Sequence, residues 1–263
     1  MDLGLKNRIA IVAASTKGLG KAVATSLALE GANVVINGRH KQNLHDASEE
    51  IEKATGKPPL AVQADVTQPE DIERLVEETV KNYGTIDILV ANAGGPPAGN
   101  FDEFDDEQWY RAVDLNLMST VRLIRRAIPL MKKQKWGRIV NIVSLTVKQP
   151  ADNLLLSNSV RAAVVGLAKS ISFDLARDNV LINNIAPYYV ATKRIDYLME
   201  QEAIRQGITR DEATKSLAGK IPIGRLATPE EFGNLVAFLC SEKNSYLTGT
   251  TIPFDGGAYR GML

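Results

Sequence analysis

Short apolar segments alternate with longer amphipathic ones along the chain. The apolar segments predict seven strands, at residues 8–13, 33–37, 60–64, 86–91, 138–143, 180–186 and 250–254. Helices are predicted between them, directly after residue 20 and over residues 42–55, 69–83, 106–133, 153–177 and 229–240. Strict alternation of strands and helices builds a parallel sheet covered on both faces. The pattern therefore predicts one doubly wound α/β domain over residues 1–263, with a sheet of seven parallel strands.

Residues 191–224 interrupt this alternation. The segment is long, polar and helix-prone, and it lies between the sixth predicted strand and the last predicted helix. Doubly wound sheets bind their ligands at the carboxyl ends of the strands. Because the insertion belongs to that edge, it is predicted to be a substrate lid.

A glycine-containing turn, Ser15–Gly20, directly follows the first predicted strand. An amphipathic helix opens behind it and is predicted to end at Gly31. The start of such a helix offers free backbone N–H groups and the positive end of the helix dipole, and both suit a pyrophosphate. The turn therefore predicts a Rossmann-type site for a dinucleotide.

The end of the second strand indicates which dinucleotide binds. An NAD site usually has an Asp or Glu about 20 residues after the glycine turn, where it binds the ribose hydroxyls. Here the residues are Asn37, Gly38, Arg39 and His40, and Lys17 adds a second cation from the turn. Cations without a carboxylate suit a 2′-phosphate, so NADP(H) is predicted in preference to NAD(H). The alternative is that both cations are ordinary surface residues.

Composition and charge narrow the range of partners. The 31 basic and 31 acidic residues cancel, so no attraction to nucleic acid or to an anionic membrane is expected. The chain lacks an apolar run long enough to span a bilayer, and Met1–Gly4 resemble no secretion signal, so we expect a cytoplasmic protein with a small-molecule substrate. The acidic residues 102–107 open a helix, where carboxylates are favourable, and predict no metal site.

Five features resemble the short-chain dehydrogenase/reductase family and occur in its order. They are Asp65-Val66, Asn92-Ala93-Gly94, Asn116, Ser144 and Asp255-Gly256-Gly257. The resemblance spans nearly the whole chain. It implies a single-domain Rossmann fold and an NADP(H)-dependent oxidoreductase that transfers a hydride to or from a small carbonyl or alcohol substrate.

The turn, the basic residues and the resemblance together predict the site. The residues predicted to bind the cofactor are Ser15, Thr16, Lys17, Gly18, Leu19, Gly20, Arg39, Asp65, Val66, Asn92, Ala93, Gly94, Arg161, Pro187, Val190 and Thr192. The residues predicted to act in catalysis are Asn116, Ser144, Ser157, Arg161 and Tyr188.

The chain departs from the family at the start of the nucleotide turn. Relatives begin this turn with Thr-Gly, whereas this chain has Ala13-Ala14. Alanine is tolerated there if its φ stays negative, and we expect that it does. Cofactor binding is then preserved by Gly18 and Gly20.

The second departure is in the catalytic pair. The family has a Tyr about thirteen residues after the Ser and a Lys four after the Tyr, and counting from Ser144 gives Ser157 and Arg161. Residues 162–170 resemble the family sequence after its Lys without a gap, which fixes this register. In the family the Lys lowers the pKa of the Tyr so that the phenol can donate a proton. Neither a serine hydroxyl nor a guanidinium can replace that acid near neutral pH.

Three functions fit this altered pair. The first is a reductase in which Ser144, Ser157 and Arg161 polarise the substrate while another group supplies the proton. The second is an NADP(H)-binding protein with little or no turnover. The third is reduction of an electron-poor double bond, which needs little acid help. Tyr188, which replaces the glycine of the family's Pro-Gly turn, is the candidate donor, the alternative being an aromatic wall under the lid.

Two further expectations concern binding partners. Family members pair the helices that correspond to residues 106–133 and 153–177, which implies a homotetramer. An apolar stripe from Val160 to Leu175 agrees, although it can face either a partner or the sheet. Arg161 or Arg194 could also meet an acidic group of the substrate.

Overall fold

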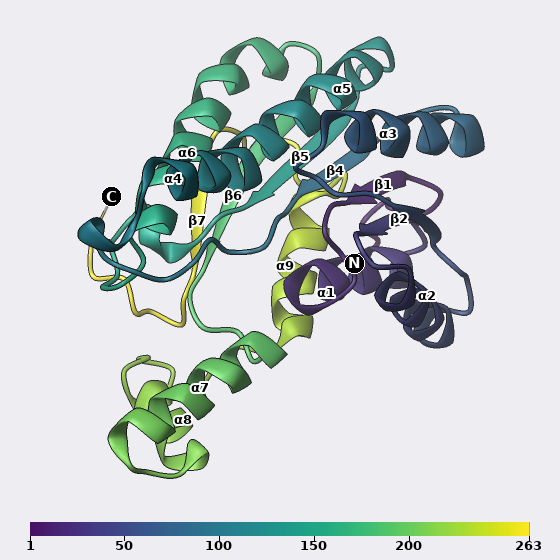
Figure 1. Cartoon of the computed structure of the whole chain (residues 1–263). Coiled ribbons are helices and arrows are strands. Elements are labelled where there is room, and N and C mark those ends of the chain that lie inside the picture. The colour runs from purple at the N-terminus through teal and green to yellow at the C-terminus, as the bar shows by residue number, and fades with distance from the viewer. Residues whose placement is uncertain (263) are drawn as a thin grey trace.

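The computed structural model describes residues 1–262 and contains one parallel sheet of seven strands (Figure 1). The strands are β1 (Ile9–Val12), β2 (Asn33–Gly38), β3 (Leu60–Gln63), β4 (Ile88–Ala91), β5 (Gly137–Ile142), β6 (Val180–Pro187) and β7 (Thr251–Phe254). Their order in the sheet is β3-β2-β1-β4-β5-β6-β7, and every pairing is parallel. The strand order reverses between β1 and β4, which is where doubly wound folds bind their ligands.

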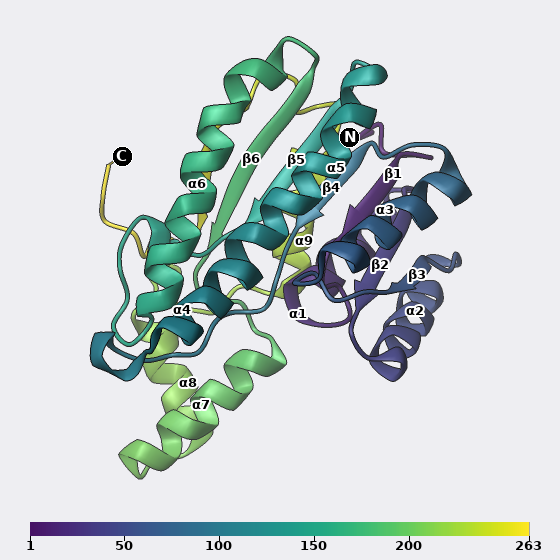
Figure 2. The same ribbon diagram turned by 45° about the horizontal axis from the view of Figure 1, so that its top comes forward.

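Helices cover both faces of this sheet (Figures 1 and 2). One face carries α1 (Gly18–Leu29), α2 (Lys41–Thr55) and α9 (Pro229–Leu239). The other carries α3 (Pro69–Tyr83), α5 (Ser119–Lys133) and α6 (Leu155–Ala176), with α4 (Asp106–Val113) leading into α5. The predicted Rossmann-type α/β fold is thus confirmed.

The apolar strands explain this double cover. In β1 the side chains of Ala10 and Val12 join the core beneath α1 and α9, whereas Ile11 joins the core on the opposite face. Successive side chains of a strand point to opposite faces, so a strand that is apolar at every position requires helices on both sides.

One predicted helix is interrupted. Residues 106–133 were expected to form a single helix, but a π-helical segment, η2 (Asp114–Met118), separates α4 from α5. The chain nevertheless continues in one direction through all three elements (Figure 2). This wider turn carries the buried Asn116, and π-helical turns are frequent at functional sites.

The apolar stripe of α6 faces the protein's own sheet. Val160, Val164, Ala168 and Leu175 are all buried in the interior clusters. The opposite face of α6 is exposed and includes Phe173. The stripe is therefore core, and assembly into a tetramer stays a prediction.

The predicted lid folds into two helices, α7 (Lys193–Gln206) and α8 (Arg210–Gly219). They pack on each other through a small core of their own, formed by Met199, Ala203, Ala213 and Leu217. Figure 2 shows this pair projecting from the carboxyl end of the sheet. Within residues 1–262, no helix is long and apolar enough to cross a membrane.

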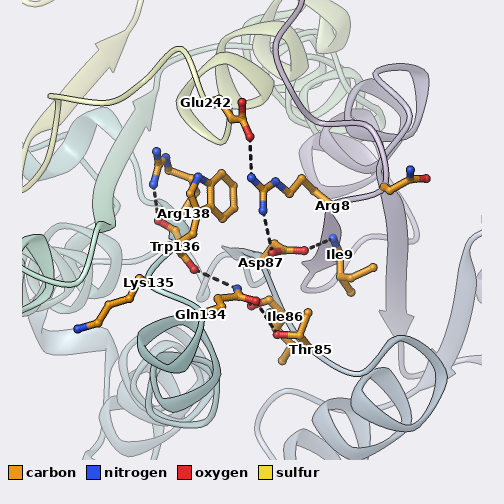
Figure 3. A network of polar contacts seen from close by, with 12 residues as sticks. Arg8, Ile9, Thr85, Ile86, Asp87, Gln134, Lys135, Trp136, Arg138 and Glu242 are labelled. Carbon is orange, nitrogen blue, oxygen red and sulfur yellow. Dashed lines mark hydrogen bonds and ion pairs between the residues drawn. The ribbon is translucent and has the colours of Figure 1, made fainter.

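A cluster of charged and aromatic residues joins the amino ends of β1, β4 and β5 (Figure 3). The Asp87 carboxylate accepts hydrogen bonds from the Ile9 backbone N–H at 2.8 Å and from Arg8 Nη1 at 3.3 Å. The Trp136 ring has Arg8 3.8 Å from its centroid and Arg138 4.6 Å from it. We name these five residues the amino-end cluster. They tie the first residues of three strands together at the edge opposite to the predicted site.

Candidate active site

The nucleotide turn after β1 is held in place from three sides. Ser15 is fully buried, and its hydroxyl donates to the Val12 carbonyl at 2.6 Å. The Asn37 side chain accepts from the Ala14 N–H at 2.9 Å, and the Asn92 side chain donates to the Ala14 carbonyl at 3.2 Å. The structure therefore gives Ser15 and Asn92, both predicted cofactor residues, a supporting role in shaping the turn.

Ala14 does not have the backbone conformation that we expected. Its φ is +47°, in the left-handed region, so the prediction of a negative φ is wrong. The cause is that both peptide groups flanking its Cα are held, because Asn37 fixes the N–H and Asn92 fixes the carbonyl. This conformation suits the glycine that relatives have there and strains alanine.

Replacing Ala14 by Gly is expected to raise the free energy of unfolding by about 0.5 to 1 kcal/mol. Relief of the left-handed strain, about 1 to 2 kcal/mol, exceeds the entropy that glycine adds to the unfolded chain. Urea denaturation checks this. The matched control is Ala13→Gly, since Ala13 is buried and is not among the described residues with positive φ. Equal destabilisation by both substitutions would show that Ala14 is not strained.

The start of α1 is built to receive an anion. Its first turn has no acidic residue, and no side chain caps the first N–H groups. A Cβ on Gly18 would meet no atom within 4 Å, so the turn is open on that side. On Gly20 a Cβ would lie 2.6 Å from the Ala14 carbonyl, which explains the need for glycine there. These features fit the pyrophosphate of a dinucleotide.

Two exposed cations, Lys17 and Arg39, flank this turn, where the sequence predicts the ribose phosphate. Lys17 directly precedes α1, and Arg39 follows β2 with 68% of its side chain exposed. The Arg39 guanidinium lies 4.0 Å from an Asp65 carboxylate oxygen. The other Asp65 oxygen accepts from Thr67 at 3.0 Å and 2.9 Å, which orients it in the turn after β3. This region thus offers positive charge together with one oriented carboxylate.

The remaining predicted cofactor residues lie around the same edge. The Thr16 methyl group contacts Gly38, where a Cβ would approach it to 2.4 Å. Pro187 ends β6, Val190 is buried, and Thr192 precedes α7 with no capping bond from its side chain. Val66 is buried, and Leu19 and Ala93 are half-buried.

Two of the predicted catalytic residues, Asn116 and Arg161, donate hydrogen bonds to the Gly94 carbonyl. Asn116 Nδ2 donates to it at 2.8 Å and Arg161 Nη2 at 3.4 Å, while Arg161 Nη1 donates to the Ile142 carbonyl at 3.1 Å. Asn116 Oδ1 is buried and has no hydrogen-bond partner among residues 1–262. Since buried polar atoms are nearly always paired, this oxygen marks a place for a bound water or ligand.

Arg161 brings a buried positive charge to this place. Burial, and to a lesser extent the positive charge of Arg194, together lower its pKa to about 10. The guanidinium therefore remains protonated at neutral pH and cannot act as a routine proton donor.

Thr146, which was not predicted as a site residue, lies between Ser144 and Ser157 and contacts both. Ser144 Oγ accepts from the Thr146 N–H at 3.3 Å, and Thr146 Oγ1 lies 3.5 Å from Ser157 Oγ. Thr146 is buried in the short helix η3 (Leu145–Val147). Its hydroxyl could have been suspected only from its position two residues after Ser144.

Tyr188 stands apart from these hydroxyls. Its ring lies 4.2 Å from that of Tyr189 and is tilted by 55°, and its N–H donates to the Phe254 carbonyl at 3.0 Å. Burial, followed by the proximity of Tyr188, raises the pKa of Tyr189. Over the part of the chain that the structure describes, no hydrogen bond joins Tyr188 to Ser144, Ser157 or Arg161. These contacts favour the aromatic wall, and a proton-donating Tyr188 stays a prediction.

The doubly wound sheet, the open helix start and the polar residues at one edge define a dinucleotide-binding α/β protein. A family model described as enoyl-(acyl carrier protein) reductase matches residues 13–259. Dehydrogenase/reductase SDR family member 4 of Oryctolagus cuniculus is 36% identical over 255 residues, which cover 97% of this chain and 94% of that protein. The chain belongs to the short-chain dehydrogenase/reductase family, as the resemblance indicated.

Two further relatives agree over the full length. The 3-oxoacyl-[acyl-carrier-protein] reductase FabG of Aquifex aeolicus is 33% identical, over 98% of this chain and all of that protein. L-sorbose reductase from Gluconobacter frateurii, solved in complex with NADPH and L-sorbose, superposes with a TM-score of 0.95 at 32% identity and covers both chains completely. These likenesses support an oxidoreductase in general terms and leave the substrate open.

Proposed function

We propose that this protein is an NADP(H)-dependent reductase of a small carbonyl compound, with Ser157 and Arg161 in place of the family's Tyr and Lys. The observation that carries the proposal is the hydrogen bonding of Asn116 and Arg161 to the Gly94 carbonyl at the carboxyl edge of the sheet. Merely holding a nucleotide does not require this arrangement. The NADPH complex of the sorbose reductase is consistent with the cofactor.

The residues of this chain divide the chemistry among them. When bound, NADPH supplies the hydride that reduces the carbonyl carbon. The Ser144 and Ser157 hydroxyls can donate hydrogen bonds to the oxygen as it gains negative charge, and Arg161 supplies positive charge nearby. The proton that completes the alcohol comes from solvent through the hydroxyls of Thr146 and Ser157, which lie 3.5 Å apart.

The preference for NADP(H) over NAD(H) rests on Lys17 and Arg39. Replacing both by Gln is expected to weaken NADPH binding about tenfold or more and to leave NADH binding little changed, because a hydrogen bond to a charged group contributes about 1.5 to 3 kcal/mol. Isothermal titration calorimetry with both nucleotides measures this. Lys81→Gln is the control, since Lys81 belongs to α3 on the other face of the sheet. Tighter binding of NADH than of NADPH by the unmodified protein would refute the assignment.

A second function has an observation in its favour. Ser157 has no useful acid form and the Arg161 pKa of about 10 keeps its proton bound at neutral pH, so the site lacks a strong general acid. This favours an NADP(H)-binding protein with little turnover, or reduction of an electron-poor double bond. Incubation with NADPH and a set of ketones, enones and alcohols separates these functions. Turnover of any of these substrate classes at a useful rate would rule out a binding protein without catalytic activity.

A further inference from the structure

The positive charge of Arg161 is buried without a counter-ion. The residue is 8% exposed, and its hydrogen bonds go to the neutral carbonyls of Ile142 and Gly94. No carboxylate of residues 1–262 lies within salt-bridge distance of it. A buried charge without a partner carries a desolvation penalty of several kcal/mol. The site is therefore incomplete without an anion.

Arg138, which is also buried, shows how this fold satisfies such a charge. Its guanidinium donates to the carbonyls of Gly137, Asn179 and Ser241 and lies over the Trp136 ring. Arg161 has fewer partners than Arg138. What lies near Arg161 is instead a second cation.

That second cation is Arg194, in the first turn of α7. A Cβ on Gly95 would lie 3.1 Å from Arg194 Nη2, so this guanidinium reaches from the lid to the turn after β4. Arg161 donates to Gly94 in the same turn. Arg194 is exposed and forms no ion pair within the described chain. Two unpaired guanidinium groups thus converge on two consecutive residues.

A short side chain, Ser157, stands beside Arg161 where the family has a tyrosine. Ser157 precedes Arg161 by one turn of α6, so both side chains lie on one face of that helix. A serine occupies far less volume than the phenol it replaces. A ligand group that approaches this face of α6 therefore meets a small hydroxyl, not a phenol, one turn from the guanidinium.

We infer that Arg161 and Arg194 together bind the carboxylate of a small oxo-acid substrate. This rests on the proposed function and names its substrate class. A carboxylate suits paired guanidinium groups because each can donate two parallel hydrogen bonds to it. The cofactor's pyrophosphate is the other possible anion. It is assigned to the start of α1, whereas Arg161 is bonded at the ends of β4 and β5.

Calorimetry on the full chain tests the inference independently of turnover. The probes are 2-oxobutanoate and 3-oxobutanoate, each against its methyl ester, titrated into the protein with and without NADPH. At least one acid is expected to bind about ten- to a hundredfold more tightly than its ester, as charge-assisted hydrogen bonds of 1.5 to 3 kcal/mol imply. Equal affinity of acid and ester, or no binding of either acid, would overturn the inference.

Variants on the lid identify the anion. Arg194→Met is expected to remove most of the preference for the acid while leaving the dissociation constant of NADPH unchanged. Arg205→Met on the same helix is the control, because Arg205 already pairs with Glu202. If Arg194→Met weakened NADPH and the acid alike, the pyrophosphate would be the bound anion and the substrate assignment would be wrong. Acid binding without turnover would preserve this inference while the proposed reductase failed.

Discussion

Replacing Ser157 by Tyr and Arg161 by Lys in the same protein is expected to raise the rate of ketone reduction with NADPH by about 10²- to 10⁴-fold. A positioned general acid contributes a factor of this size. The two positions lie one turn apart on α6, and Ser157 already faces Thr146 near Ser144, so the phenol would enter beside the hydroxyls of the site.

The rate of NADPH oxidation with a neutral ketone or ester measures this gain. A neutral substrate is needed because Lys replaces the guanidinium to which we assign the carboxylate. The matched control carries Phe and Lys, which restores the ring and the charge without the phenol. The Tyr variant should also gain a pH dependence that the Phe variant lacks. Equal rates for the two variants would show that a missing acid does not limit this site.

Replacing Asp87 by Ala is expected to lower the free energy of unfolding by about 2 to 4 kcal/mol. The substitution leaves the Ile9 N–H and the Arg8 guanidinium without their acceptor in a largely buried place, and removing one partner of such a group costs this much. Because Arg8 also lies over Trp136, its release loosens the rest of the amino-end cluster.

Urea denaturation measures this loss, with Glu242→Gln as the matched control. Glu242 also pairs with Arg8, but its side chain is 51% exposed, and exposed ion pairs contribute at most about 1 kcal/mol. Similar losses in both variants would mean that the burial of Asp87 is unimportant.

The architecture could be predicted from the sequence because a sheet that is buried on both faces requires a recognisable pattern of apolar residues. A strand such as β1 is apolar at every position, and each helix between the strands shows one apolar face. The place of Arg161 was also predictable, since residues one turn apart on a helix share a face whatever surrounds them.

Other features required coordinates. The π-helical turn around Asn116 spans five residues, too few for the spacing of apolar residues to distinguish it from an α-helix. The positive φ of Ala14 follows from bonds to Asn37, which is in β2, and to Asn92, which directly follows β4. Similarly, Arg194 reaches Gly95 from a segment almost a hundred residues away, and no local pattern records such a contact.

The amino-end cluster and the candidate site occupy opposite ends of the same strands. Asp87 and Arg138 fasten β1, β4 and β5 where they begin, while Gly94 and Ser144 follow β4 and β5 where they finish. Residues of the candidate site can therefore be substituted without disrupting the amino-end cluster. The chemistry at one end of the strands can therefore differ from that of relatives, as Ser157 and Arg161 do, on a scaffold that still folds.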